Sequence, residues 1–103
     1  MTNLLVCCSQ GMSSSALMQK MRNYIEQEGI EATVKVVTTA QIMGRECEFD
    51  AVLIGPQIRF EKNKIQNAFP DKVVEMIPMQ LYGRLDGEAV VKFALKLLEE
   101  KKG

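Results

Sequence analysis

Residues 3–15 have the sequence NLLVCCSQGMSSS, in which a short apolar run passes directly into small and polar residues. The apolar run, Asn3–Cys8, lacks polar alternation and predicts a strand that is buried on both faces, as in a parallel sheet. The segment Ser9–Ser15 predicts a loop, and the apolar periodicity after it predicts a helix that begins near Ser13 and ends at Gly29. A strand, a small-residue loop and a helix in this order indicate an α/β fold.

Strands and helices are predicted to alternate along the rest of the chain. Strands are predicted at 32–37, 51–54 and 72–77, and further helices at 57–69 and 87–100. Residues 38–48 are predicted to form a loop or a short helical turn, and residues 78–83 a turn. Right-handed crossovers then favour a flavodoxin-like, three-layer fold, with a four-stranded parallel sheet of order 2-1-3-4 and helices on both faces.

Length and composition indicate one globular domain over residues 1–103. Hydrophobic residues make up 47% of the chain and charged residues 25%, which is ordinary for such a domain. The 13 basic and 13 acidic residues balance, which argues against a nucleic-acid partner. No apolar stretch approaches the roughly 20 residues needed to span a bilayer, and the first residues lack the basic region of a signal peptide.

The chain has three cysteines, Cys7, Cys8 and Cys47, and no histidine. An odd count with two adjacent residues does not suggest a disulfide framework and favours a reducing compartment. Without histidine there is no Cys-His or Ser-His pair, and no ligand spacing supports a zinc site, so neither a metal nor a cofactor is expected.

The strongest candidate for chemistry is Cys8, because strand order reverses at the carboxyl end of the first strand. Gly11 allows a tight turn there, and the free amides and dipole of the following helix favour an anion. The same field lowers the pKa of a thiol and suits a phosphocysteine. The alternative is that Cys8 is a small core residue and the serines only cap the helix, and both interpretations remain open from these residues alone.

The other two cysteines are predicted to have no chemical role. Cys7 lies within the strand and is expected to pack in the core. Cys47 stands between two glutamates, which raise a thiol pKa, and is interpreted as incidental.

Three segments carry a family resemblance. Residues 8–15, CSQGMSSS, resemble the C-S-x-G-M-S-T-S loop of the lactose/cellobiose family of phosphotransferase-system enzyme IIB proteins, with Ser14 in place of the threonine. Residues 50–58, DAVLIGPQI, resemble the family's D-V-V-L-L-G-P-Q-I turn, and residues 81–87, LYGRLDG, its L-Y-G-K-V-D-G segment. The three occur in order and span nearly the whole chain.

This resemblance implies a phosphotransferase component in which Cys8 becomes a phosphocysteine. It implies a donor, a phosphohistidine on a IIA protein, and an acceptor, a sugar bound by a membrane IIC permease, expected to be cellobiose or a related β-linked disaccharide. It also implies a cytoplasmic protein that reaches the membrane only through IIC. The implied phosphoryl-binding loop consists of Ser9, Gln10, Gly11, Met12, Ser13, Ser14 and Ser15.

Further residues are candidates for the rim of this site: Gly55, Pro56, Gln57, Tyr82 and Asp86. Each also has a structural interpretation, because Gly55-Pro56 can simply turn the chain, Tyr82 can be core, and Asp86 can cap the last helix. Met12 and Ile58 are the apolar candidates for a partner-docking surface, with burial in the core as the alternative.

Two other classes of function compete. Low-molecular-weight tyrosine phosphatases and thiol-based arsenate reductases share this fold type, but the phosphatase loop C-x-x-x-x-x-R places an arginine where this chain has Ser14, or Ser13 counting from Cys7. A flavin-binding module usually flanks its ring with aromatic residues, and this chain has no tryptophan and two tyrosines. The sugar and the oligomeric state do not follow from the sequence.

Overall fold

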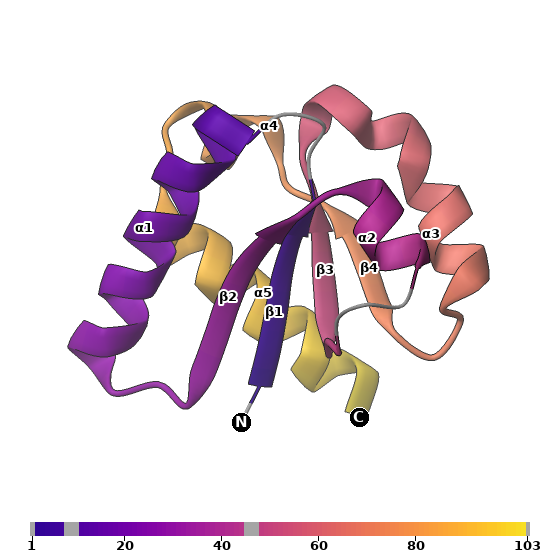
Figure 1. The fold of residues 1–103 in the computed structure, drawn as a ribbon. Helices are drawn as coiled ribbons and strands as arrows, with labels where there is room; N and C mark the ends of the chain where they lie inside the picture. Colours follow the sequence, from indigo (N-terminus) through magenta and orange to yellow (C-terminus); the bar gives the residue numbers. More distant parts are fainter. Residues whose placement is uncertain (1, 8–10, 45–47, 103) are drawn as a thin grey trace.

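Four parallel strands form the sheet of the computed structural model, which describes residues 2–7, 11–44 and 48–102, with the backbone alone for residues 11–15 and 102. The strands are β1 (Thr2–Cys7), β2 (Ala32–Val37), β3 (Ala51–Ile54) and β4 (Val73–Met76). Their order is β2-β1-β3-β4, which confirms the prediction (Figure 1). Central strand β1 pairs with β2 along its whole length and with β3 from Leu4 to Cys7.

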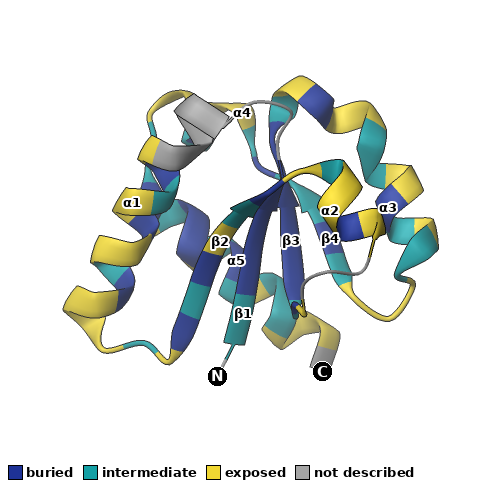
Figure 2. Cartoon of the chain, in the orientation of Figure 1, coloured by how far each residue is buried: buried dark blue, intermediate teal, exposed yellow. Residues whose placement is uncertain are grey.

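Helices cover both faces of this sheet. They are α1 (Gly11–Glu28), α2 (Thr39–Met43), the 3-10 helix η1 (Pro56–Glu61), α3 (Lys62–Ala68), α4 (Met79–Gly83) and α5 (Gly87–Lys102). Helices α1 and α5 pack on one face, while α2, η1 and α3 lie on the other (Figure 1). The strands are largely buried and the helices show alternating buried and exposed bands, as the apolar periodicity predicts (Figure 2).

Successive residues of the central strands pack into two separate apolar clusters. In β1, Leu4 and Val6 face the α1–α5 side, whereas Leu5 and Cys7 face the α2–α3 side. This alternation follows from the two-residue period of a strand. A buried strand therefore contributes side chains to both apolar clusters, so that the helices on both faces pack against the same sheet.

The end of α1 shows how local sequence sets the chain direction. Gly29 has a φ of 64°, a left-handed conformation that favours glycine. The Ile30 amide bonds to the Ile25 carbonyl at 3.0 Å and the Gly29 amide to the Glu26 carbonyl at 3.3 Å, which is a Schellman motif. The predicted helix stop at Gly29 is confirmed.

Two predicted elements differ from the structure. The single helix expected at 57–69 is a 3-10 helix followed by α3, because the Ile58 amide bonds to the Gly55 carbonyl only three residues back, and Ile58 has non-helical angles. The turn expected at 78–83 is helix α4, in which the Pro78 carbonyl accepts from the amides of Leu81 and Tyr82.

Within the three described segments, no helix is both long and apolar enough to cross a membrane.

Candidate functional site

The carboxyl end of β1 is held on both sides. Cys7, its last residue, pairs with Val37 of β2 and Ile54 of β3, and the Cys7 carbonyl accepts from the Gly55 amide at 2.9 Å. The Cys7 side chain is fully buried, with its Sγ 3.6 Å from Oγ1 of Thr39 at the start of α2. Cys7 is thus a packed core residue, as predicted, and its pairing on both sides fixes the point at which β1 ends.

The predicted nucleophile and the first loop residues, Cys8, Ser9 and Gln10, lie outside the described residues. Helix α1 begins at Gly11, two residues before the predicted start, so residues 11–15 belong to the helix and not to a loop. Residues 11–15 contain neither proline nor a β-branched residue, and Gly11, which has a low helix propensity, stands at the first position of the helix and not in its interior. The 18-residue helix therefore starts four residues after β1, with its amides and positive dipole end at this edge of the sheet.

The segments that directly follow the four strands are poor in charged residues, and the first carboxylate after β3 is Glu61, the last residue of η1. Residues 8–19, 38–43, 55–60 and 77–83 leave the carboxyl ends of β1 to β4, and Arg59 is the only charged residue in them. A helix N-terminus without a nearby carboxylate attracts anions, because no negative side chain competes for its amides. The carboxyl edge of the sheet is electrostatically suited to a phosphoryl group.

At the end of β3, the three rim candidates become progressively more exposed. Gly55 is buried beside Cys7, Pro56 is half-buried as the first residue of η1, and Gln57 is exposed. Ile58 is 5% exposed and packs in the core on the α2–α3 side. Ile58 is therefore not a surface residue, and the suggestion that it helps a partner to dock is wrong.

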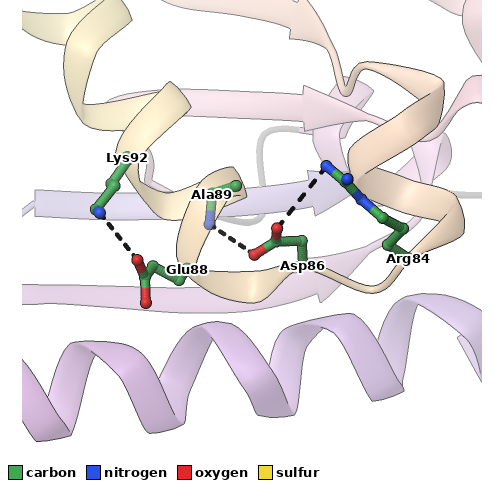
Figure 3. Close-up of polar contacts among 5 residues, drawn as sticks. All are labelled: Arg84, Asp86, Glu88, Ala89 and Lys92. Atoms are coloured by element: carbon green, nitrogen blue, oxygen red, sulfur yellow. Dashed lines mark hydrogen bonds and ion pairs between the residues drawn. The ribbon is translucent and has the colours of Figure 1, made fainter.

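The two candidates after β4 have structural roles. Tyr82 is 8% exposed and belongs to the core on the α1–α5 side. Asp86 caps α5, since its Oδ1 accepts from the Ala89 amide at 3.1 Å, and its Oδ2 lies 4.0 Å from the Arg84 guanidinium (Figure 3). The predicted cap is confirmed.

A surface ion pair follows the cap on α5. Lys92 donates to Glu88 Oε2 at 2.9 Å, one helical turn away (Figure 3). Its Nζ also lies 5.9 Å from the centre of the Tyr24 ring on α1. The hydrogen bond to Glu88 and the charge of its carboxylate raise the pKa of Lys92 above its ordinary value, with a smaller contribution from Tyr24. The contacts of Lys92 with Glu88 and Tyr24 therefore link α5 to α1 on the outer side of this layer.

Two exposed apolar residues at the carboxyl edge were not predicted. Phe60 in η1 is 73% exposed and Met79, the first residue of α4, is 65% exposed. The signal for Phe60 was present, because it falls off the inward stripe that Ile58 and Ile65 define. Met79 had no such signal, since the helix that carries it was not predicted.

Comparison with known proteins identifies the family. The family model for the "PTS system, Lactose/Cellobiose specific IIB subunit" matches residues 3–93. The chain belongs to this IIB family. It is 38% identical over 100 residues to the "PTS system oligo-beta-mannoside-specific EIIB component" of Bacillus subtilis (strain 168), covering 95% of this chain and 97% of that protein.

Other relatives extend the likeness. The "PTS system cellobiose-specific EIIB component" of Lactococcus lactis subsp. lactis (strain IL1403) is 29% identical, covering 92% of this chain and 94% of that protein. The solution structure of a cellobiose-specific phosphotransferase IIB component from Borrelia burgdorferi superposes with a TM-score of 0.80 at 31% identity, over 97% of this chain and 94% of that one. A lactose-specific IIB domain from Streptococcus pneumoniae, 13% identical over 93% and 95% of the two chains, has a TM-score of 0.78 and shares the fold.

Family membership establishes the class of function. The chain is a IIB component of a sugar phosphotransferase system, a phosphoryl carrier, and such components work with IIA and IIC partners. The sugars named for the relatives differ, since one is specific for an oligo-β-mannoside and another for cellobiose.

Proposed function

We propose that this carrier holds its phosphoryl group on the thiol of Cys8, receives it from a IIA phosphohistidine and delivers it to a sugar bound by a membrane IIC permease. The observation that carries the proposal is the placement of β1. Its last residue, Cys7, is locked between β2 and β3 at the point where strand order reverses, and α1 begins four residues later.

The electrostatics of this edge support phosphoryl binding next to Cys8. The dipole of α1 and its first free amides supply positive potential, and residues 8–19, which follow β1 and include the start of α1, contain no carboxylate. We propose that Gln10 to Ser15 hold the phosphoryl oxygens through the start of this helix. Gly55, Pro56 and Gln57 form the rim on the β3 side, next to Cys7.

The chemistry is two successive displacements at phosphorus. In the first, the Cys8 thiolate forms the S–P bond while the P–N bond to histidine breaks, and the ring nitrogen keeps the electron pair. In the second, the sugar hydroxyl oxygen forms the new O–P bond, its proton passes to a base on the acceptor side, and the thiolate leaves. A thiolate stabilised by the helix N-terminus serves in both steps, as nucleophile and as leaving group.

The carrier must also resist hydrolysis between the two steps. Tyrosine phosphatases clamp the transferring group with a loop arginine, and this chain has serines at both possible positions, Ser13 and Ser14. Without that clamp, attack by water on the phosphocysteine is slow. The same absence argues against the phosphatase and arsenate reductase alternatives.

We propose cellobiose or a related β-linked disaccharide as the sugar. The support comes from two relatives, which are named for an oligo-β-mannoside and for cellobiose and are 38% and 29% identical to this chain. In this arrangement the chain lies in the cytoplasm and meets the membrane only through IIC, whose binding site selects the sugar.

The test is sugar-phosphate formation in a reconstituted system. The chain is mixed with phosphoenolpyruvate, the general phosphotransferase proteins, a IIA protein of the lactose/cellobiose class and membrane vesicles that contain a IIC permease of that class. Cellobiose, β-mannobiose, chitobiose and lactose are offered in parallel. The Cys8→Ala variant should form no sugar phosphate, whereas Cys7→Ala and Cys47→Ala, the matched controls, should form it at near wild-type rates.

Two results would contradict the proposal. Sugar phosphate made by the Cys8→Ala variant would remove the thiol from the pathway. Turnover of an aryl phosphate by the wild-type chain, lost in Cys8→Ala, would instead favour the phosphatase alternative. Formation of lactose phosphate alone would exclude cellobiose as the sugar, but it would leave the carrier role and the β-linked class intact, because lactose is also β-linked.

A further inference from the structure

Two large apolar side chains are exposed on elements that directly follow neighbouring strands. Phe60, at 73% exposure, lies in η1 after β3, and Met79, at 65% exposure, begins α4 after β4. Ile58 and Tyr82, on the same two elements, are buried, so exposure of Phe60 and Met79 is not a consequence of loose packing there. Exposed phenylalanine and methionine are enriched at the centres of protein interfaces.

These residues lie on opposite sides of the sheet edge from which the candidate nucleophile leaves. Helix η1 packs with the α2–α3 layer and α4 with the α1–α5 layer, and Figure 1 shows both at the end where the strand arrows point. A protein that reaches the residue after Cys7 in line with a phosphorus atom must cover this edge. Such a protein removes Phe60 and Met79 from water when it docks.

The charges of this edge select between the two partners. Arg59, next to Phe60, is exposed, and none of the ion pairs in the described part of the chain involves it. The donor arrives with a phosphoryl group of about −1.5 to −2 charges, whereas the acceptor brings a neutral sugar hydroxyl. The nearest carboxylate, Glu61 at the end of η1, pairs with Lys64 at 4.0 Å, so the charge of Arg59 is complementary to the charged donor.

We propose that Phe60 and Met79 form the apolar part of the docking surface for the phosphorylated IIA protein, with Arg59 steering its approach. This inference rests on the proposed function and names the surface that the donor contacts. Because Phe60 and Met79 project from different elements, each contributes separately to affinity.

The experiment is a single-turnover measurement of phosphoryl transfer from a phosphorylated IIA protein of the lactose/cellobiose class, at increasing donor concentration. Phe60→Ser should raise the half-saturating donor concentration about tenfold and Met79→Ser roughly threefold, with the saturated rate unchanged. Arg59→Gln should lower the second-order rate roughly threefold at low salt and weaken its salt dependence.

The controls are exposed residues of similar kind elsewhere: Pro70→Ser, at the amino end of β4, and Lys96→Gln on α5. Both should behave as wild type. Chemical denaturation of every variant checks folding, and Phe60 and Met79 are exposed enough for the fold to tolerate the changes.

Three outcomes would overturn the docking surface, and they are distinguishable. If the wild-type chain accepts phosphoryl and Phe60→Ser and Met79→Ser saturate at the wild-type concentration, this surface is wrong and the proposed function stands. If these variants are impaired only in transfer to vesicles that contain IIC, the permease is the occupant. If the wild-type chain accepts no phosphoryl group, the proposed function is wrong and the docking surface with it.

Discussion

The two faces of the sheet are covered in different ways. One lies under two long helices, α1 with 18 residues and α5 with 16, which pack against each other. The other lies under short pieces, α2 with five residues, η1 with six and α3 with seven. Each of the six covering elements starts within a few residues of a strand or of another helix, so the connections in both layers are short.

We infer that the long-helix face positions the phosphoryl site and that the short-helix face contributes residues that recognise the partner protein. On the long-helix face, α1 is fixed by its packing against the sheet and α5. The N-terminus of α1 supplies the positive potential that we propose for phosphoryl binding. On the short-helix face, η1 begins two residues after β3, at the carboxyl ends of the strands. Its residues Arg59 and Phe60 are exposed to solvent. A phosphoryl carrier needs a rigid phosphoryl site and an exposed docking surface, because its partner proteins must bind and dissociate in each cycle.

The largest expected effect tests whether the two faces are equally part of the fold. Leu17 of α1 and Ile65 of α3 are both fully buried, one on each face. Leu17→Ala and Ile65→Ala should each lower the free energy of unfolding by about 2–5 kcal/mol, from lost transfer energy and the cavity left behind. Urea denaturation followed by circular dichroism measures this. A loss well under 1 kcal/mol for Ile65→Ala would show that the short-helix face is a loosely attached layer.

A smaller effect probes the contact between the long helices. A Cβ on Gly87, at the start of α5, would lie 2.5 Å from the Lys20 carbonyl carbon and 2.6 Å from the Met21 nitrogen. Gly87→Ala must push α5 away from α1 and should cost about 1–3 kcal/mol in the free energy of unfolding.

The matched control for this change is Gly83→Ala in α4. A Cβ there meets nothing within 4 Å, so the variant should be as stable as wild type or slightly more so. Denaturation of both variants checks the pair of expectations. Equal stability of Gly87→Ala and wild type would contradict the close approach of α1 and α5.

The next effect separates a capping role for Asp86 from a role at the site rim. Asp86→Ala removes the acceptor for the Ala89 amide and should cost about 1 kcal/mol of stability. Asp86→Asn keeps a capping oxygen, so its stability and its rate of phosphoryl acceptance should both remain near wild type. A large loss of phosphoryl acceptance in Asp86→Asn, with unchanged stability, would show that Asp86 acts at the rim of the phosphoryl site.

The smallest expected effect is a change in the pKa of Lys92, which pairs with Glu88 on α5. Glu88→Gln removes the carboxylate that raises the pKa of Lys92, so that pKa should fall, as NMR titration of the Lys92 side chain would show. Because the pKa is raised in the folded chain, the stabilisation is complete below the ordinary lysine pKa and is lost as pH rises through the raised value. An unchanged Lys92 pKa in Glu88→Gln would contradict the assignment of its cause.

The fold followed from the sequence more fully than the site did. The strand order, the burial of Cys7, the stop at Gly29 and the Asp86 cap were all predicted, because each depends on local pattern or capping chemistry. The break between η1 and α3 was missed because Ile58 and Ile65 point inward whether the segment is one helix or two. The exposure of Met79 depends on how α4 packs, which periodicity in a short segment does not reveal. The role of Cys8 stays a prediction from its position in the sequence and in the family motif.

The central claim, that the phosphoryl group resides on the Cys8 sulfur, is tested most directly by locating it. The wild-type chain is incubated with phosphoenolpyruvate, the general phosphotransferase proteins and a IIA protein, and is then digested and mapped by mass spectrometry under conditions that preserve a thiophosphate ester. We predict one phosphoryl group per chain, on Cys8, with Cys7 and Cys47 unmodified. A phosphoryl group on any serine of residues 9–15, or on either of the other cysteines, would contradict the account.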